Sequence, residues 1–309
     1  MDSKGLITLP EGVHFFQRGW LSSNNILLVD DQQSVLIDTG YYTHAQQTLD
    51  LVSHALMGRP LQTIINTHLH SDHCGGNAFL QSSFSGLTTW VPPGHAPFVR
   101  NWDALRLGYV GTGQHCPPFI ANNSLIIGQD FLIGGLSWQC LAAPGHDPHS
   151  FILFSPETGI CITADALWEN GFGVVFPEIE GEDGFDEVAA TLDLIQSLNP
   201  SIILPGHGAP FSDVFGALTR ARSRLARFID QPQSHAFYAA KVLVKFKLLE
   251  LQRISTYDFA NWALTASHLE KIHHAHFNDR PFADWFDYVC NDLVRSGAAL
   301  VDAAHLVNA

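Results

Sequence analysis

The chain has 309 residues, 46% of them apolar, which is enough for one large domain with a smaller one beside it. Its net charge of −14 is unevenly distributed: residues 1–209 carry five Lys and Arg against twenty Asp and Glu, whereas residues 210–309 carry eleven against ten. Nucleic-acid binding is typically accompanied by a basic surface. The acidic larger part therefore counts against a polyanionic substrate, and we do not expect nucleic acid as a partner.

The sequence also gives expectations about location. No apolar run approaches the roughly 18 residues of a membrane span, and residues 1–5 do not begin a basic segment followed by an apolar one. Five cysteines, an odd number without paired spacing, suit a reducing compartment better than a disulfide framework. We therefore expect no membrane contact, no signal peptide and a cytoplasmic location.

The first predicted elements are two strands at 26–29 and 34–37, with Asp30-Asp31 as the hairpin turn between them. A helix is predicted over 43–57, because apolar residues recur at 45, 49, 52 and 56 and Gly58 and Pro60 follow. Residues 61–66 predict a short buried strand that leads directly into a cluster of histidines.

The alternation of strands and helices continues through the middle of the chain. A helix is predicted over 186–198, and strands are predicted over 131–133, 136–141, 151–154, 160–163 and 201–204. Hairpins and crossovers in one chain predict an α+β fold of layered sheets flanked by helices.

The composition changes after about residue 212. The predicted elements there are helices, over 215–229, 236–251, 257–275 and 281–296. We therefore divide the chain into residues 1–212, which hold the mixed sheets, and residues 213–309, a helical C-terminal domain.

The segment His68-Leu69-His70-Ser71-Asp72-His73 is the densest group of chemically capable side chains. Three imidazoles and a carboxylate within six residues form a donor set that suits zinc, iron or manganese better than calcium or magnesium. From the His and Asp content of the chain, this pattern would arise by chance in roughly one chain of this kind in 300. The sequence therefore predicts a metal site here.

The cluster and the motifs after it resemble the metallo-β-lactamase superfamily. The resemblance covers roughly residues 10–212 and is specific because the motifs occur together and in order. They are Leu36-Ile37-Asp38-Thr39-Gly40, Thr67 to Gly76 around the cluster, Pro144-Gly145-His146, Thr163-Ala164-Asp165 and Pro205-Gly206-His207-Gly208. Ala164 departs from the pattern, since relatives usually have Gly there.

The resemblance implies an αββα sandwich with two metals at one edge of its sheets. It assigns His68, His70 and His146 to the first metal, and Asp72, His73 and His207 to the second. Asp165 would bridge both metals. Two further side chains, Asp38 and His149, would orient the ligands by hydrogen bonding without binding metal themselves.

The expected chemistry is hydrolysis. Two divalent ions, zinc foremost with iron or manganese as alternatives, can share a water molecule and lower its pKa towards 7. The resulting bridging hydroxide would attack an electrophilic carbon or phosphorus, and Asp72 is the candidate to protonate the leaving group.

The substrate pocket is less well specified by the sequence. Residues 97–120 form a long, aromatic and Gly-containing insertion, and residues 168–176 follow the bridging Asp165. Either segment could cover the metals, although the aromatic residues could equally pack the insertion onto its own domain. The candidate pocket residues are Trp102, Tyr109, Phe119, Trp168 and Phe172.

The end of the chain offers a second, looser resemblance. Residues 292–301 predict a helix, a glycine turn and a short strand, as in the winged-helix tail of some hydrolases of this superfamily. The alternative is a helical cap that packs on the core and forms a homodimer. The other histidines, including His95 and His235, are expected to be surface or packing residues, and Cys74 a small buried one.

These observations favour hydrolysis of a small ester, thioester or lactone. A glyoxalase II-like enzyme would share the ligand set, but no basic glutathione-binding segment is evident in the C-terminal part. The alternatives are a phosphodiesterase, a β-lactamase-type hydrolase, or a metal-bound regulatory protein whose tail binds nucleic acid or a partner.

Overall fold

The computed structural model describes residues 7–309. Residues 1–6 lie outside the described part, and with them the N-terminal residues on which the expectation of no signal peptide rests. Within residues 7–309, no helix is both long enough and apolar enough to cross a membrane.

The first half of the chain builds a six-stranded sheet. Its strands lie in sequence order: β1 (Val13–Phe16), β2 (Asn25–Val29), β3 (Ser34–Ile37), β4 (Thr63–Ile65), β5 (Thr88–Val91) and β6 (Asn123–Ser124). The first three strands pair antiparallel, and the rest continue parallel from β3. Every residue of β2 and β3 is buried, as expected for strands that are covered on both faces.

The second sheet has five strands in the order β11-β10-β9-β8-β7. They are β7 (Asp130–Ile133), β8 (Leu136–Ala142), β9 (Phe151–Ser155), β10 (Ile160–Ala164) and β11 (Ile202–Pro205). Pairing is antiparallel from β7 to β10 and parallel between β10 and β11. The predicted strands are therefore present, each within about two residues of its predicted bounds.

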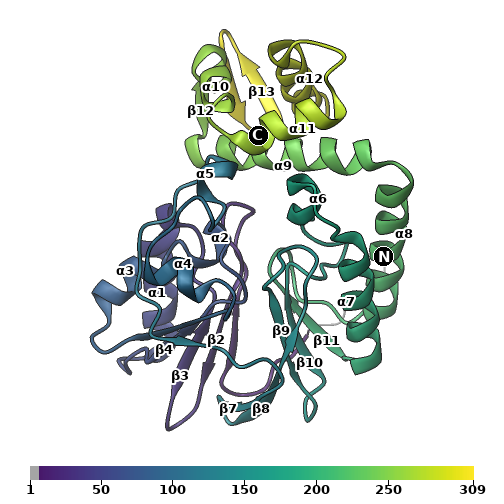
Figure 1. Cartoon of the computed structure of the whole chain (residues 1–309). Coiled ribbons are helices and arrows are strands. Elements are labelled where there is room, and N and C mark those ends of the chain that lie inside the picture. Colours follow the sequence, from purple (N-terminus) through teal and green to yellow (C-terminus); the bar gives the residue numbers. More distant parts are fainter. Residues whose placement is uncertain (1–6) are drawn as a thin grey trace.

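The two sheets pack face to face, and helices cover their outer faces (Figure 1). Ile26 and Leu28 of β2 point into the inter-sheet core with Trp138 and Phe151, whereas the alternate residue Leu27 faces the outer helices. On the first sheet these helices are α1 (Ala45–Leu56) and α3 (Asn77–Ser83), and on the second α7 (Phe185–Leu198) and α8 (Val214–Asp230). This arrangement is the expected αββα sandwich.

The C-terminal part lies across one end of both sheets (Figure 1). It contains α9 (Pro232–Leu251), α10 (Thr256–Ala263), α11 (Ser267–His276) and α12 (Phe282–Arg295), with a small antiparallel sheet of β12 (Arg253–Ser255), β14 (His305–Asn308) and β13 (Ala299–Asp302). The helix predicted over 257–275 is two helices. The Thr265 hydroxyl donates to the carbonyl oxygen of Trp262 at 2.7 Å, a local bond that competes with helix continuation.

The topology brings several strand ends to one edge of the sandwich. β3 and β4 are parallel, and so are β10 and β11. β8 runs in the same direction as β10, because both pair antiparallel with β9 between them. The loops that follow these five strands therefore meet at the same edge, and α9 lies across it.

Candidate metal centre

Each predicted metal ligand follows one of these strand ends. His68 and His70 follow β4, and Asp72 and His73 lie in α2 (Ser71–Cys74). The other three follow β8, β10 and β11; they are His146, Asp165 and His207. All seven side chains meet in three overlapping groups, in each of which one donor atom per residue lies within 4.8 Å of the others. The structure thus brings together every residue that the sequence singled out as a ligand.

One group is formed by His68, His70 and His146. The Nε2 atom of His68 lies 3.1 Å from Nδ1 of His70. Nε2 of His146 lies 3.4 Å from Oδ2 of Asp165. The opposite ring nitrogen of His146 donates to the carbonyl oxygen of Val174 at 2.5 Å, which fixes the tautomer that leaves Nε2 free.

The second group is formed by Asp72, His73 and His207, and the third, His68, His73 and Asp165, lies between the two. Nε2 of His207 lies 3.1 Å from Oδ2 of Asp72, and Nε2 of His73 lies 3.8 Å from the same oxygen. The second oxygen of Asp165, Oδ1, is 3.4 Å from Nε2 of His73. Asp165 therefore presents one carboxylate oxygen to each group, as a bridging ligand would.

Burial and neighbouring charge act in opposite directions on the histidines of the two groups. Burial lowers the pKa of His70 to about 3 and also holds the pKa of His68 well below its usual value, so both imidazoles are neutral at pH 7. Burial alone would lower the pKa of His73, but the carboxylates of Asp165, Asp38 and Asp72 hold it well above its usual range. The second group thus favours positive charge at His73.

Two buried atoms test whether a metal fits. Nε2 of His73 and Nε2 of His146 are buried and have no hydrogen-bond partner in the described part of the chain, which is costly unless something else satisfies them. Ligands about 2.1 Å from a tetrahedral metal lie about 3.4 Å from one another. The donor separations of 3.1, 3.4 and 3.8 Å bracket that value. The residues therefore fit divalent metals in both groups.

Asp38 supports the second group from behind. Its Oδ2 accepts hydrogen bonds from Nδ1 of His73 at 2.7 Å and from the hydroxyl of Thr67 at 2.8 Å, and its Oδ1 accepts from the Thr67 backbone N–H at 2.9 Å. Asp38 is buried and has a φ of +58°, an uncommon left-handed backbone for a residue other than glycine. These contacts hold His73 with Nε2 turned towards the site.

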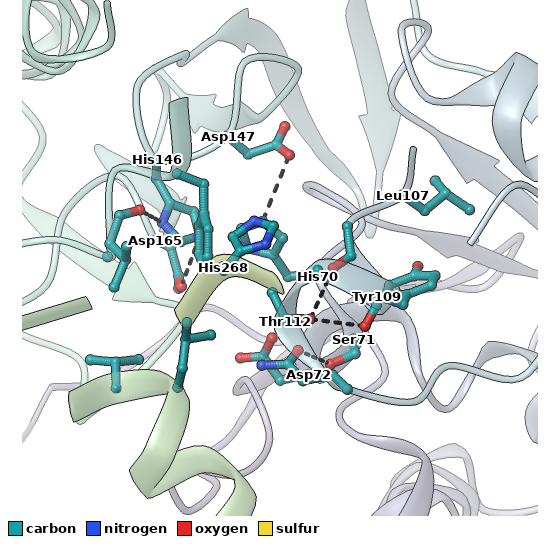
Figure 2. A pocket seen from close by; sticks show the side chains of 18 of the residues that line it. His70, Ser71, Asp72, Leu107, Tyr109, Thr112, His146, Asp147, Asp165 and His268 are labelled. Atoms are coloured by element: carbon teal, nitrogen blue, oxygen red, sulfur yellow. Dashed lines mark hydrogen bonds and ion pairs between the residues drawn. The ribbon is translucent and has the colours of Figure 1, made fainter. Parts of the chain in front are cut away.

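Asp147, and not His149, faces a predicted ligand, which corrects the sequence-based expectation. Oδ2 of Asp147 lies 3.9 Å from Nε2 of His70 (Figure 2). The same oxygen lies 3.5 Å from Nε2 of His95. His149 is exposed; its backbone N–H donates to Asp147 at 2.8 Å, and its ring packs edge-on against His95. The residue directly after the Pro-Gly-His motif could have been flagged, since an acid there is poised to pair with a nearby imidazole.

Similar sequences agree with this geometry. Residues 18–207, more than half of the chain, match the sequence profile of the metallo-beta-lactamase superfamily. The chain belongs to the metallo-β-lactamase superfamily.

Relatives within the superfamily carry several names. A probable metallo-hydrolase of Streptococcus pyogenes is 27% identical over 195 residues, which are 60% of this chain and 78% of that protein. An atrochrysone carboxyl ACP thioesterase of Aspergillus fumigatus is 23% identical over 247 residues, 80% of this chain and 66% of the relative. A hydroxyacylglutathione hydrolase of Idiomarina loihiensis is 25% identical over 148 residues, covering 48% of this chain and 47% of the relative.

Solved structures confirm the fold. A metallo-β-lactamase family protein from Thermus thermophilus superposes with a TM-score of 0.58 at 19% identity, covering 98% of this chain and all of the other. The B3 metallo-β-lactamase BLEG-1 gives a TM-score of 0.54 at 20% identity, over 67% of this chain and 96% of the other.

In this superfamily member, a cavity of about 730 Å³ opens above the metal-binding residues. Figure 2 shows His70, Asp72, His146 and Asp165 around it, with His268 of α11 nearby. This volume is within the range of small-molecule sites. Two of the five predicted pocket residues, Tyr109 and Trp168, line it, and the indole N–H of Trp168 donates to Oδ1 of Asp165 at 3.2 Å.

The other three predicted pocket residues lie elsewhere. Trp102 and Phe119 pack with Tyr109 in an apolar cluster, in which the Trp102 ring lies 5.8 Å from that of Tyr109 and 5.6 Å from that of Phe119. Phe172 is fully buried beneath α8, against Phe228. Trp102 and Phe119 thus cover their own domain, because burying these large rings together removes more apolar area from water than lining a wet cavity would. Other residues of the 97–120 insertion do line the cavity, as expected: Phe98, 105–109, Gly111, Thr112 and Gln114.

Several cavity residues are not among the five predicted pocket residues, although Phe176 belongs to the predicted wall segment 168–176. Trp20 is 59% exposed and stacks on His207 with ring centroids 5.2 Å apart. Phe176, at the start of α6 (Phe176–Glu180), lies 4.8 Å from the ring of His70. Tyr238, Val242 and Phe246 of α9 also line the cavity. Their apolar spacing predicts a helix. No sequence pattern indicates that this helix packs over the loops that carry the predicted ligands.

His235 connects α9 to the first group of ligands. Its Nε2 accepts the backbone N–H of Val175 at 3.1 Å, and the adjacent carbonyl of Val174 accepts from His146. His235 is buried, so the expectation that it is a packing residue understates its contacts. The C-terminal helix thus supports the loop that orients a predicted ligand.

Proposed function

We propose that the protein is a dinuclear metal-dependent hydrolase, with zinc the expected metal, that cleaves a small ester, thioester or lactone. The observation that carries this proposal is the position of Asp165, whose two oxygens face two separate histidine groups on the floor of a cavity. His68, His70 and His146 would hold one ion, Asp72, His73 and His207 the other, and Asp165 both.

Two divalent ions, when bound, supply a water of lowered pKa and polarise the oxygen of a carbonyl group. The chain's own residues position the reaction. Asp38 and the Val174 carbonyl accept hydrogen bonds from His73 and His146 and so fix these imidazoles with their free nitrogens converging, and Asp147 lies 3.9 Å from His70. Trp168 holds Oδ1 of Asp165, and the rings of Trp20 and Phe176 pack against His207 and His70 and limit the access of water to them.

Asp72 is the candidate proton carrier. It lines the cavity, and 14% of its side chain is exposed, compared with 7% for Asp165 and 3% for Asp38. A carboxyl that touches both the ligand group and the cavity can pass a proton to a leaving alkoxide or thiolate. The names of two relatives, the ACP thioesterase and the hydroxyacylglutathione hydrolase, support an acyl substrate.

The test is turnover by zinc-loaded protein of acyl esters, acyl thioesters, lactones and bis-p-nitrophenyl phosphate, together with metal content. We expect two metals per chain and turnover of at least one acyl class, both reduced in Asp165→Asn. Turnover of the phosphodiester alone would favour a phosphodiesterase. Failure to turn over any substrate, combined with salt-sensitive binding of DNA, would favour a regulatory protein.

A further inference from the structure

The helix α9 is apolar on two opposite faces. Ala240, Val244 and Leu248 are buried in the core of the C-terminal part. Tyr238, Val242 and Phe246 line the cavity above the predicted ligands. The two sets are offset by two residues, about 200° around the helix, so they point in opposite directions. Tyr238 and Val242 touch the edge of the same core, and Phe246 is buried against Leu21 and Tyr41, but Tyr238 and Val242 stay half-buried where the second face meets the cavity.

The cavity face, which we call the α9 stripe, consists of Tyr238, Val242 and Phe246. Tyr238 and Val242 are only half-buried. Apolar surface that meets water in an open cavity is less stable than the same surface covered by another apolar group. A ligand with an apolar group would recover that area. Phe176 extends the same apolar wall to within 4.8 Å of the His70 ring.

The cavity has little to offer an anion away from the metal-binding residues. Within the described chain, its permanently charged cations are Arg106 and Lys271. Arg106 pairs with Asp103 at 3.8 Å and lies over the Phe98 ring, and Lys271 pairs with Glu180. Three carboxylates outside the ligand set, Asp147, Glu180 and Glu182, also line it. Three acids against two bases leave this part of the cavity with a net charge of −1.

We infer that the substrate of the proposed hydrolase carries an uncharged, apolar acyl or alcohol group, which binds along the α9 stripe with Val242 at its centre. Substrates with a carboxylate or phosphate at that end are disfavoured, because they would bury charge beside carboxylates with no free cation. Val242 is then a residue that determines specificity. This inference rests on the proposed function for its reaction, but its binding component can be measured separately.

Two amides of equal chain length test the binding component, because amides are poor substrates. N-phenylhexanamide is neutral, and the monoanilide of adipic acid places a carboxylate at the end of the same six-carbon chain. With zinc-loaded protein, we expect calorimetry to give at least tenfold tighter binding of the neutral amide. Equal affinities, or tighter binding of the acid, would overturn the inference.

Variants locate the site of discrimination. Val242→Lys supplies the missing cation, so the preference for the neutral amide should fall at least tenfold. Leu251→Lys is the matched control, since Leu251 ends the same helix, is 43% exposed and does not line the cavity, and it should keep the wild-type ratio. Val242→Ala, which introduces no charge, should weaken the neutral amide about fourfold to tenfold. An unchanged ratio in Val242→Lys would place the discrimination elsewhere.

Esters separate this inference from the proposed function. Phenyl hexanoate and the phenyl monoester of adipic acid repeat the comparison as kcat/KM, and the neutral ester should be favoured at least tenfold. If the protein binds the neutral amide more tightly but hydrolyses neither ester, the proposed acyl hydrolysis is wrong. The inference that the α9 stripe binds an uncharged group would still hold. Hydrolysis of both esters at equal rates would support the proposed acyl hydrolysis and overturn the preference for an uncharged group along the α9 stripe.

Discussion

Asp38 accepts a 2.7 Å hydrogen bond from Nδ1 of His73, and the ring nitrogen on the other side of His73 has no hydrogen-bond partner among residues 7–309. The same carboxylate accepts two hydrogen bonds from Thr67, the residue before His68. One buried acid therefore connects the two ends of the His68–His73 segment. It does so from a left-handed backbone, with φ of +58°, which aspartate adopts more readily than most residues.

Asp38→Asn should weaken metal binding while the fold is retained. Asparagine keeps the size and tolerates the backbone, but it cannot accept from both Thr67 and His73 with the strength of a carboxylate. Loss of such a supporting group typically costs 10-fold to 100-fold in metal affinity or activity. Competition with a zinc chelator measures the affinity. Asp50→Asn, an exposed position on α1, is the control and should bind zinc like the wild type. Wild-type affinity in Asp38→Asn would show that the hydrogen bond does not orient His73.

Gly173→Ala should disturb the first group of ligands. A Cβ at position 173 would lie 2.3 Å from Nδ1 of His146, closer than non-bonded atoms approach, so the ring would have to move off Val174. At the same limiting zinc concentration, we expect this variant to bind about one zinc ion per chain fewer than the wild type. Its activity should fall at least 100-fold. Gly19→Ala is the matched change, because a Cβ there meets nothing within 4 Å. If both variants keep two metals, the close packing at Gly173 does not hold His146.

His235 should make stability depend on pH below neutrality. Burial lowers the pKa of His235 to about 4 from 6.5 in the unfolded chain. As pH falls through 6.5 the unfolded chain takes up the proton first, so the contribution is complete above pH 6.5 and declines down to about pH 4. The free energy of unfolding should fall by roughly 3 kcal/mol over that window.

Urea unfolding of wild type and His235→Gln between pH 7.5 and 4.5 isolates this contribution. Glutamine can still accept from the Val175 N–H but does not titrate. The wild-type curve should fall more steeply than the curve of the variant. Parallel curves would mean that His235 is not the group that takes up the proton.

How far the sequence predicts this structure depends on whether a feature is local. His68 to His73 lie within six residues, and the other ligands follow strand ends that short apolar runs already mark, so both the ligands and the sandwich were predictable. Ala164, noted as a departure from the usual glycine, has a φ of +46°, which explains why glycine is usual there. The sequence indicated two segments of the cavity wall, 97–120 and 168–176, but not which of their aromatic residues face the cavity, because Trp102 and Phe119 differ from Tyr109 only in their long-range packing.

Met57→Gly should stabilise the protein. Met57 ends α1 in a left-handed conformation, with φ of +50°, and is 83% exposed, so its side chain contributes little packing to offset the strain. Glycine relieves a cost of about 1 kcal/mol at such a position. Asn199→Gly at the end of α7, where φ is +49°, is the comparison, and its gain should be smaller because asparagine tolerates this backbone. Equal gains in urea unfolding would contradict the argument from side-chain strain.

Metal removal should lower the free energy of unfolding but leave the protein folded. Three carboxylates, Asp38, Asp72 and Asp165, surround His73, and no other cationic side chain in the described chain pairs with them besides the histidines of the site. Zinc at about 100 times its dissociation constant should raise the free energy of unfolding by about 2.7 kcal/mol for each ion bound independently. Thermal unfolding in zinc and in chelator measures the difference, and circular dichroism checks that the metal-free chain is folded. In His207→Ala the zinc-dependent gain should fall by about half, because the group of Asp72, His73 and His207 loses a ligand while the group of His68, His70 and His146 remains complete. A melting temperature that does not respond to zinc in the wild-type protein would show that the converging nitrogens and carboxylates do not bind it.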